Sequence, residues 1–92
     1  MSPAMDSEAR FRDALARVKA LPQQPSNVLL DLYGLFKQAS DGDVSGKRPG
    51  VLDLRGRAKW DAWAARQGMT REAAMLAYAE LVDRLCGRGA NP

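Results

Sequence analysis

Apolar residues recur at helical spacing in four segments of this chain, and no segment alternates apolar and polar residues as a half-buried strand does. Residues that oppose helix formation separate the segments: Pro22 and Pro25, a glycine- and proline-rich stretch over 41–53, and Gly68. Because helices joined by mostly short links pack as a bundle, the pattern predicts an all-α fold with one long loop of about a dozen residues.

The bounds of the four helices follow from the periodic residues and from side chains that can cap exposed amides. Asp6 or Ser7 is expected to cap the first helix, Ser26 or Asn27 the second, and Thr70 the fourth. The expected helices cover about residues 6–20, from 26 or 27 to just before 41, about 54–66, and from 70 to just before 86.

The length of the chain suits one hydrophobic core and is too short for two, so residues 1–92 are expected to form a single domain. Fourteen Lys and Arg against 11 Asp and Glu give a net charge of +3 and a pI of about 9.4. This balance favours anionic partners, but it does not choose between nucleic acid and phosphorylated small molecules.

Cysteine usage and hydropathy bear on the compartment. Cys86 is the single cysteine, and charged residues interrupt the first twenty positions, so neither a disulfide framework nor a secretory signal is expected. No run approaches the roughly 20 apolar residues of a membrane span, so stable membrane insertion is not expected. We expect a cytoplasmic protein, and the abundance of alanine and arginine favours a bacterial source.

The absence of histidine removes the usual general base and the usual imidazole metal ligand, which disfavours an enzyme. The stretch that begins at Asp41 imitates a calcium loop, but Leu52 stands at its twelfth position, where a bidentate glutamate is required. Gly46-Lys47 is not a P-loop, because Arg48 stands where Ser or Thr would hold magnesium. No catalytic residue, metal site or cofactor is predicted.

Aromatic and cationic side chains gather in the second and third expected helices. Tyr33 and Lys37 are spaced four apart and therefore share one helix face. Lys59 stands beside Trp60 and close to Trp63. Such a set suits an anionic, ring-bearing ligand. The alternative is that the lysines are solvated surface residues and that at least one tryptophan belongs to the core.

Longer runs of sequence extend this set. They are YGLFKQASDGD at 33–43, KRPGVLD at 47–53 and GRAKWDAW at 56–63, followed by Gly68, AMLAY at 74–78 and, more loosely, Phe11 and Val18-Lys19. Together these residues closely resemble the acyl-CoA-binding protein family, over about residues 9–85.

The resemblance implies a four-helix, up-down-down-up bundle that binds medium- and long-chain acyl-CoA thioesters non-covalently, as an intracellular carrier and pool former. It implies a ligand rather than a cofactor, and we expect a monomer that binds no nucleic acid. Six residues match family positions that contact the CoA headgroup: Tyr33 and Lys37 at the adenine and 3′-phosphate end, Lys59 and Tyr78 as two further contacts, and Lys19 and Arg55 near the phosphates.

Two features depart from the family pattern. The link between Pro25 and Tyr33 is one residue shorter than usual, so the connection from the first helix into the second must be tighter. A tighter connection changes where Lys19 lies relative to the headgroup. Phe36 stands where a tyrosine is common, which removes one hydroxyl from the phosphate neighbourhood.

The acyl chain of such a ligand needs apolar side chains around it. Four leucines are expected near it, although ordinary core packing is the alternative for each: Leu15, Leu29, Leu30 and Leu54.

The competing class is a small basic helical module that binds nucleic acid or another protein. The net charge of +3 and the Lys47-Arg48 loop near Trp60 favour it. A nucleic-acid binder would lose affinity steeply with salt, whereas a ligand with a buried acyl chain would lose far less.

Overall fold

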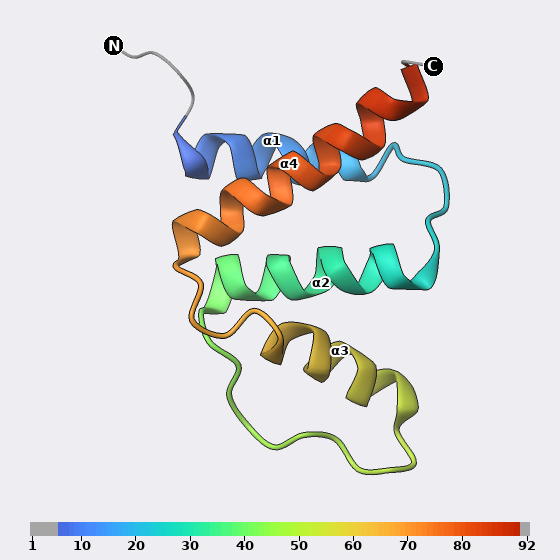
Figure 1. The fold of residues 1–92 in the computed structure, drawn as a ribbon, viewed down its shortest axis with the longest axis vertical. Helices are drawn as coiled ribbons and strands as arrows, with labels where there is room; N and C mark the ends of the chain where they lie inside the picture. Colours follow the sequence, from blue (N-terminus) through green and yellow to red (C-terminus); the bar gives the residue numbers. More distant parts are fainter. Residues whose placement is uncertain (1–5, 91–92) are drawn as a thin grey trace.

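The computed structural model describes residues 6–90, with side chains through residue 87. Within this range the chain forms four α-helices and no strand: α1 (Ser7–Val18), α2 (Ser26–Asp41), α3 (Leu54–Ala64) and α4 (Arg71–Ala90). α1 and α4 run in one direction while α2 and α3 run in the other (Figure 1), so the predicted up-down-down-up bundle is confirmed. The domain expected over residues 1–92 includes 1–5 and 91–92, which lie outside the described residues.

Two of the predicted caps are confirmed. The Asp6 carboxylate accepts a hydrogen bond from the Ala9 amide at 2.8 Å, and the Thr70 hydroxyl accepts one from the Ala73 amide at 3.0 Å. α3 has a cap that the sequence analysis missed, since Asp53 Oδ1 accepts from the Gly56 amide at 2.9 Å. Each bond satisfies an amide that has no partner within the first turn of its helix.

The predicted cap of α2 is wrong. Pro25 occupies the N-cap position in an extended conformation, and no side chain caps this helix end. The Pro25 carbonyl already accepts from the amides of Val28 and Leu29, each at 3.0 Å. Ser26 is therefore the first helical residue rather than the cap.

The helix ends differ from the predicted bounds by a few residues. α1 ends at Val18 and α3 at Ala64, each two residues early, whereas α2 includes Asp41. α4 continues past Gly87 to Ala90. A glycine inside a helix costs only about 1 kcal/mol relative to alanine, so it weakens a helix without necessarily ending it.

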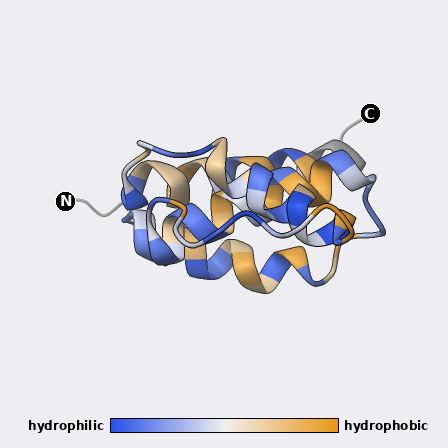
Figure 2. Ribbon diagram, turned by 90° about the horizontal axis from the view of Figure 1, so that it is seen from below, coloured by the Kyte–Doolittle hydropathy of each residue, from blue (hydrophilic) through white to orange (hydrophobic). Residues whose placement is uncertain are grey.

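α4 packs across both α1 and α2, while α3 packs on α2 alone. The centre of the bundle is filled by apolar side chains that are almost fully buried, among them Phe11, Leu32, Leu35, Tyr78 and Val82. Figure 2 shows hydrophobic and hydrophilic stretches alternating along the helices, as amphipathic helices require. Because α3 contacts only α2, no third helix packs on α3.

The start of the long loop is fastened to the bundle by Asp43. Its Oδ1 accepts from Gln38 Nε2 at 2.8 Å and from the Gly68 amide at 2.9 Å, and Gln38, 0% exposed, also donates to the Met69 carbonyl at 2.9 Å. The hydrogen bond from the Gly68 amide lowers the pKa of Asp43, and the smaller effect of the hydrogen bond from Gln38 acts in the same direction. Trp63 Nε1 donates to the Gly42 carbonyl at 2.7 Å, which ties the same loop to α3.

The close approach of α2 and α3 depends on Gly34. A Cβ atom at this position would lie 2.3 Å from the Ala62 carbonyl oxygen and 2.8 Å from its carbon, and both are backbone atoms that cannot rotate away. Contacts below 3.0 Å force the helices to shift, since a packed interface has little free space. Gly34 therefore sets the spacing of the two helices that form the site described below.

Gly34→Ala is expected to destabilise the bundle, whereas Gly87→Ala in α4 is not, because a Cβ at Gly87 meets nothing within 4 Å. Both changes raise helix propensity equally, so their difference isolates the clash. We expect Gly34→Ala to be less stable than Gly87→Ala by about 2 kcal/mol in urea unfolding. Equal stability of the two variants would show that α2 and α3 are not held at this spacing.

Candidate functional site

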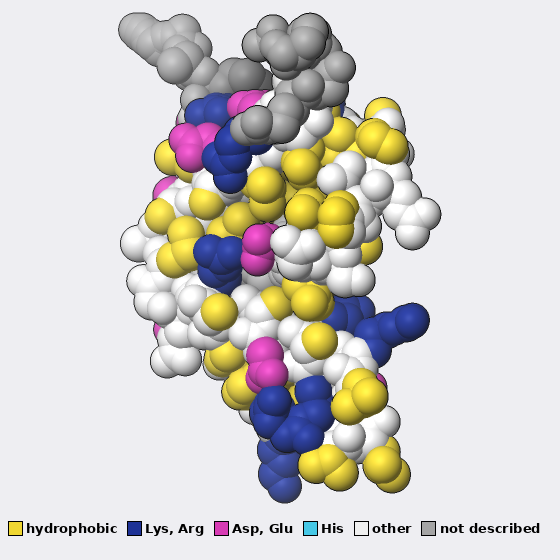
Figure 3. All heavy atoms as spheres, turned by 45° about the vertical axis from the view of Figure 1, so that its right-hand side comes forward, with side chains coloured by type: hydrophobic (Ala, Val, Ile, Leu, Met, Phe, Trp, Pro, Cys, Tyr) yellow, Lys and Arg dark blue, Asp and Glu magenta, His cyan; other side chains and the backbone are white. Residues whose placement is uncertain are grey.

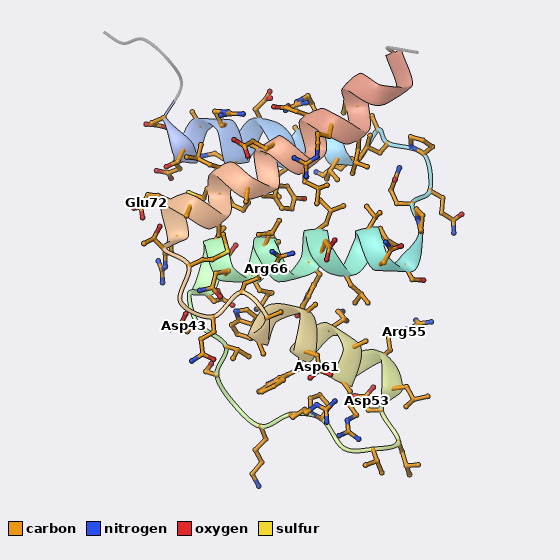
Figure 4. All side chains as sticks on the ribbon, in the orientation of Figure 1. Asp43, Asp53, Arg55, Asp61, Arg66 and Glu72 are labelled. Carbon is orange, nitrogen blue, oxygen red and sulfur yellow. The ribbon has the colours of Figure 1, made fainter. Side chains whose placement is uncertain are left out.

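A groove of about 510 Å³ lies between α2 and α3. Its lining combines apolar, aromatic and cationic side chains: Ser26, Leu29, Leu30 and Tyr33 from α2, with Arg55, Ala58 and Lys59 from α3. Figure 4 shows Arg55 at the start of α3, while Asp43 lies near the opposite end of the helix pair, just after α2 ends. The groove therefore follows the two helices from their N-terminal ends.

The parallel course of α2 and α3 brings residues of one helix opposite residues of the other in a regular register. Lys59 Nζ lies 4.9 Å from the centroid of the Tyr33 ring, and one turn further on Lys37 Nζ lies 4.6 Å from the Trp63 ring. Both distances are within the range of cation–π attraction. The aromatic residue comes from α2 in the first pair and from α3 in the second. Lys59 and Lys37 therefore follow each other along the line where the two helices meet.

Neither cation that lines the groove has an acidic partner within the described residues. Ion pairs with Asp or Glu engage six basic side chains elsewhere in the described part of the chain: Arg10, Arg12, Arg17, Lys37, Arg48 and Arg66. Over residues 6–87, neither Arg55 nor Lys59 makes an ion pair. Their charges are therefore available to an anionic ligand.

Lys37 differs because its Nζ forms an ion pair with the Asp41 carboxylate, one turn along α2. The hydrogen bond to Asp41 raises the pKa of Lys37, so the ammonium stays protonated at neutral pH. An anionic ligand that reaches Lys37 must compete with this carboxylate.

Large aliphatic side chains line the N-terminal part of the groove. Leu30 is half-buried, whereas Leu29 is 50% exposed, which is high for a large aliphatic side chain in a helix. The two leucines lie one turn before Tyr33 on α2. The groove thus carries leucines beside Arg55 at its N-terminal end and an aromatic ring with a lysine one turn further along, an arrangement that can hold a molecule with an anionic head and an apolar chain.

The structure brings half of the ten predicted site residues to this groove. Tyr33, Lys59, Arg55, Leu29 and Leu30 line it, and Lys37 lies one turn beyond Tyr33 on α2. Ser26 and Ala58 also line it but were not predicted. Ser26 was assigned to the helix cap instead, and a small residue such as Ala58 carries no chemical signal; only its helical spacing from Arg55 could have indicated it.

The remaining four predicted residues lie outside the groove lining. Lys19 is exposed just after α1 ends, and Leu15 on α1 packs against the core. Leu54 is 77% exposed at the first position of α3. The Tyr78 ring is buried against Phe11, with 5.3 Å between ring centroids, and burial raises the pKa of its phenol.

Two further features are absent from the described residues. No group of three or more His, Cys, Asp or Glu side chains is placed to hold a metal ion there. Within the same range no helix has the length and hydropathy needed to cross a membrane.

Comparisons with known proteins bear on this fold and groove. The model of the family described as acyl CoA binding protein matches residues 8–82. Acyl-CoA-binding protein homolog 1 of Caenorhabditis elegans is 47% identical over 79 residues, which cover 85% of this chain and 92% of that protein. The acyl-CoA-binding protein homolog of Drosophila melanogaster is 45% identical over 80 residues, which cover 86% and 93%.

A solved structure agrees with these sequence comparisons. The crystal structure of Oryza sativa acyl-CoA-binding protein 2 is similar with a TM-score of 0.88 and 38% identity, covering 91% of this chain and 94% of that one. Fold, groove and sequence together define a small helical ligand-binding domain. The chain belongs to the acyl-CoA-binding protein family.

The source expected from composition finds no support. The similar proteins named above come from a nematode, an insect and a plant rather than from bacteria. High alanine and arginine content reflects helix propensity and surface charge as much as coding composition, so it is a poor indicator of source.

Proposed function

We propose that this protein binds medium- and long-chain acyl-CoA thioesters non-covalently and serves as an intracellular carrier that keeps a pool of them in solution. The groove between α2 and α3 carries this proposal, because Leu29 and Leu30 line its N-terminal part, while Tyr33 and Lys59, a cation without an acidic partner, lie one turn further along. Family membership supports the same ligand, since the related nematode and insect proteins are named for acyl-CoA binding.

The end of the groove with Tyr33 and Lys59 suits the CoA headgroup. Tyr33 offers a ring face for the adenine, and Lys59 offers an ammonium for a phosphate beside it. Lys37, after release from Asp41, adds further charge at this end, and Arg55 offers another charge from the start of α3. The roles of Tyr78 and Lys19 at the headgroup, and of Leu15 and Leu54 at the acyl chain, stay predictions.

The leucines of the groove suit the acyl chain. About a dozen methylenes at roughly 0.8 kcal/mol each offer about 10 kcal/mol before binding entropy and incomplete burial are subtracted. Hydrogen bonds to charged phosphates contribute about 1.5 to 3 kcal/mol each. The acyl chain therefore supplies much of the affinity, and the headgroup contacts supply the specificity for CoA.

We propose that the protein acts as a cytoplasmic monomer. Its single acyl-CoA-binding domain is proposed to span residues 1–92, with a core over about 9–85. It performs no reaction on its ligand, because binding needs only stacking surface, cations and apolar contact. Nucleic acid is not a partner in this proposal.

Calorimetry with two ligands tests the proposal against the nucleic-acid alternative. Palmitoyl-CoA is expected to bind with submicromolar Kd and to lose little affinity as salt rises, because its chain leaves water. An oligonucleotide duplex is expected to give no specific heat of binding. Tight, steeply salt-dependent duplex binding without palmitoyl-CoA binding would overturn the proposal.

Asp41→Asn is expected to tighten acyl-CoA binding about two- to fivefold, because it frees Lys37 from a surface ion pair of the usual strength. The control is the same change in a Lys37→Gln background, where no gain is expected. Calorimetric Kd values for the four proteins of this cycle measure the coupling. An equal gain in both backgrounds would mean that Asp41 acts by general charge repulsion rather than through Lys37.

A further inference from the structure

Trp63 on α3 faces Lys37 across the line where α2 and α3 meet. The Lys37 ammonium lies 4.6 Å from the centroid of the Trp63 ring, within the range of cation–π attraction. Trp63 is 9% exposed and the Lys37 side chain 24% exposed. Because both side chains are largely shielded from water, the attraction is stronger than between two exposed side chains. The Trp63 ring therefore holds the Lys37 ammonium one turn beyond Tyr33.

A hydrogen bond fixes the orientation of the Trp63 ring. Its Nε1 donates to the carbonyl of Gly42, the residue that follows α2, at 2.7 Å. The next residue, Asp43, accepts from the Gly68 amide at 2.9 Å, so this part of the chain is itself held in place. The ring cannot turn without breaking the bond to Gly42. Its face is therefore presented to Lys37 in one orientation.

Asp41 is the second group that holds Lys37, through their ion pair. On the face that Figure 3 shows, acidic side chains lie beside basic ones at several places, so carboxylates of the protein compete with a ligand for its cations. A ligand phosphate that pairs with Lys37 displaces the Asp41 carboxylate, because the two anions repel each other. The uncharged Trp63 ring does not repel a phosphate. It can therefore stay in contact with Lys37 when the ligand binds.

We propose that Trp63 is a positioning residue, which keeps Lys37 in place for a phosphate of the ligand once Asp41 has been displaced. A lysine ammonium is carried on a flexible four-carbon stem, and fixing it costs rotamer entropy. A ring that already holds the ammonium lowers this cost of binding. Trp63 thereby strengthens the preference for a ligand that carries a phosphate at this end of the groove. The inference rests on the proposed function and on the predicted place of Lys37 at the 3′-phosphate end of CoA.

Trp60 offers a matched control for Trp63. It lies three residues earlier on the same helix and is also partly shielded from solvent. Over residues 6–87 no cation lies over its ring, and its buried Nε1 donates to no acceptor there. Trp60→Phe therefore changes a tryptophan of α3 without changing what holds Lys37.

Calorimetry with palmitoyl-CoA and its 3′-dephospho analogue tests the inference, because the ratio of the two Kd values isolates the contribution of one phosphate. Wild type is expected to favour palmitoyl-CoA about tenfold or more. Trp63→Leu is expected to lower this preference about fivefold. Trp63→Phe keeps a ring but loses the Nε1 donor, and is expected to lower it about two- to threefold. Trp60→Phe is expected to leave it within about twofold of wild type.

The same ratio in a Lys37→Met background shows whether Trp63 acts through Lys37. In that background Trp63→Leu is expected to leave the ratio unchanged, since the ammonium that the ring holds is gone. Trp63→Phe, which keeps an aromatic side chain in the interface, carries the test if Trp63→Leu does not fold.

NMR of the ligand-free protein shows directly whether the ring holds Lys37. The ring current of Trp63 is expected to shift the Lys37 ε-methylene protons upfield, and Trp63→Leu but not Trp60→Phe is expected to abolish this shift. The shift is expected to persist in the complex with palmitoyl-CoA. Its absence from the free protein, or its loss in the complex, would overturn the inference.

A purely structural role of Trp63 gives a different pattern of affinities. Equal losses for both ligands would show that Trp63 acts only by packing α3 on α2, and an equal fall of the ratio in the Lys37→Met background would show that it does not act through Lys37. Either result would overturn the inference and leave the proposed function unaffected. Failure of wild type to bind palmitoyl-CoA would overturn both.

Discussion

Palmitoyl-CoA is expected to bind this protein at least about a thousandfold more tightly than free CoA. The two ligands share the headgroup, so their difference measures the transfer of the acyl chain from water to the leucines of the groove. Burying even half of a chain worth about 10 kcal/mol supplies about 5 kcal/mol, or more than three decades of affinity. Free palmitate lacks the headgroup and is expected to bind weakly, because it cannot engage Lys59 and Tyr33.

Calorimetry with the three ligands under one buffer condition measures this expectation. Burial of the chain also predicts a heat capacity change on binding that is more negative for palmitoyl-CoA than for free CoA. Equal affinities for palmitoyl-CoA and CoA would show that the chain stays in water. Palmitate binding as tight as palmitoyl-CoA would show that the cations of the groove do not hold the headgroup.

Lys59→Ala and Tyr33→Ala are each expected to weaken palmitoyl-CoA binding by about 10- to 100-fold. Lys59 loses a charged hydrogen bond to phosphate, and Tyr33 loses a ring face for stacking. The two side chains also contact each other, since the ammonium lies 4.9 Å from the ring centroid. The double variant is therefore expected to lose less than the product of the two single losses.

Thermal melts and a matched lysine variant control this experiment. Lys59 is exposed and Tyr33 is half-buried at the rim of the groove, so both variants are expected to stay folded with small changes in Tm. Lys47→Ala removes an exposed lysine outside the groove and is expected to leave the Kd in solution unchanged. Losses of similar size in all three variants would indicate a general effect of net charge rather than contact at the groove.

The number and order of the helices could be predicted because apolar periodicity and breakers act locally. The helix ends were less predictable, because they depend on which group satisfies each terminal amide. At α2 the Pro25 carbonyl serves Val28 and Leu29, so no side-chain cap is needed. At α4, Gly87 does not end the helix, which continues to Ala90, because a glycine inside a helix costs only about 1 kcal/mol relative to alanine.

The groove was only partly predictable, because it depends on the register between two helices. Helical spacing places Tyr33 and Lys37 on one face, but only the packing of α2 on α3 brings Lys59 over Tyr33. Gly34 permits that packing, and nothing local distinguishes it from other glycines. The Lys37–Asp41 pair was within reach of sequence reasoning, since the two residues are spaced four apart on one helix.

The site itself is tested most directly by an NMR titration of the labelled protein with palmitoyl-CoA. The largest amide shift changes are expected along the groove, at Leu29, Leu30, Tyr33, Ala58 and Lys59. Addition of free CoA is expected to shift Tyr33 and Lys59 while leaving the two leucines almost unchanged. Saturable binding of palmitoyl-CoA with no shift changes at these residues would contradict the groove between α2 and α3 as the acyl-CoA site.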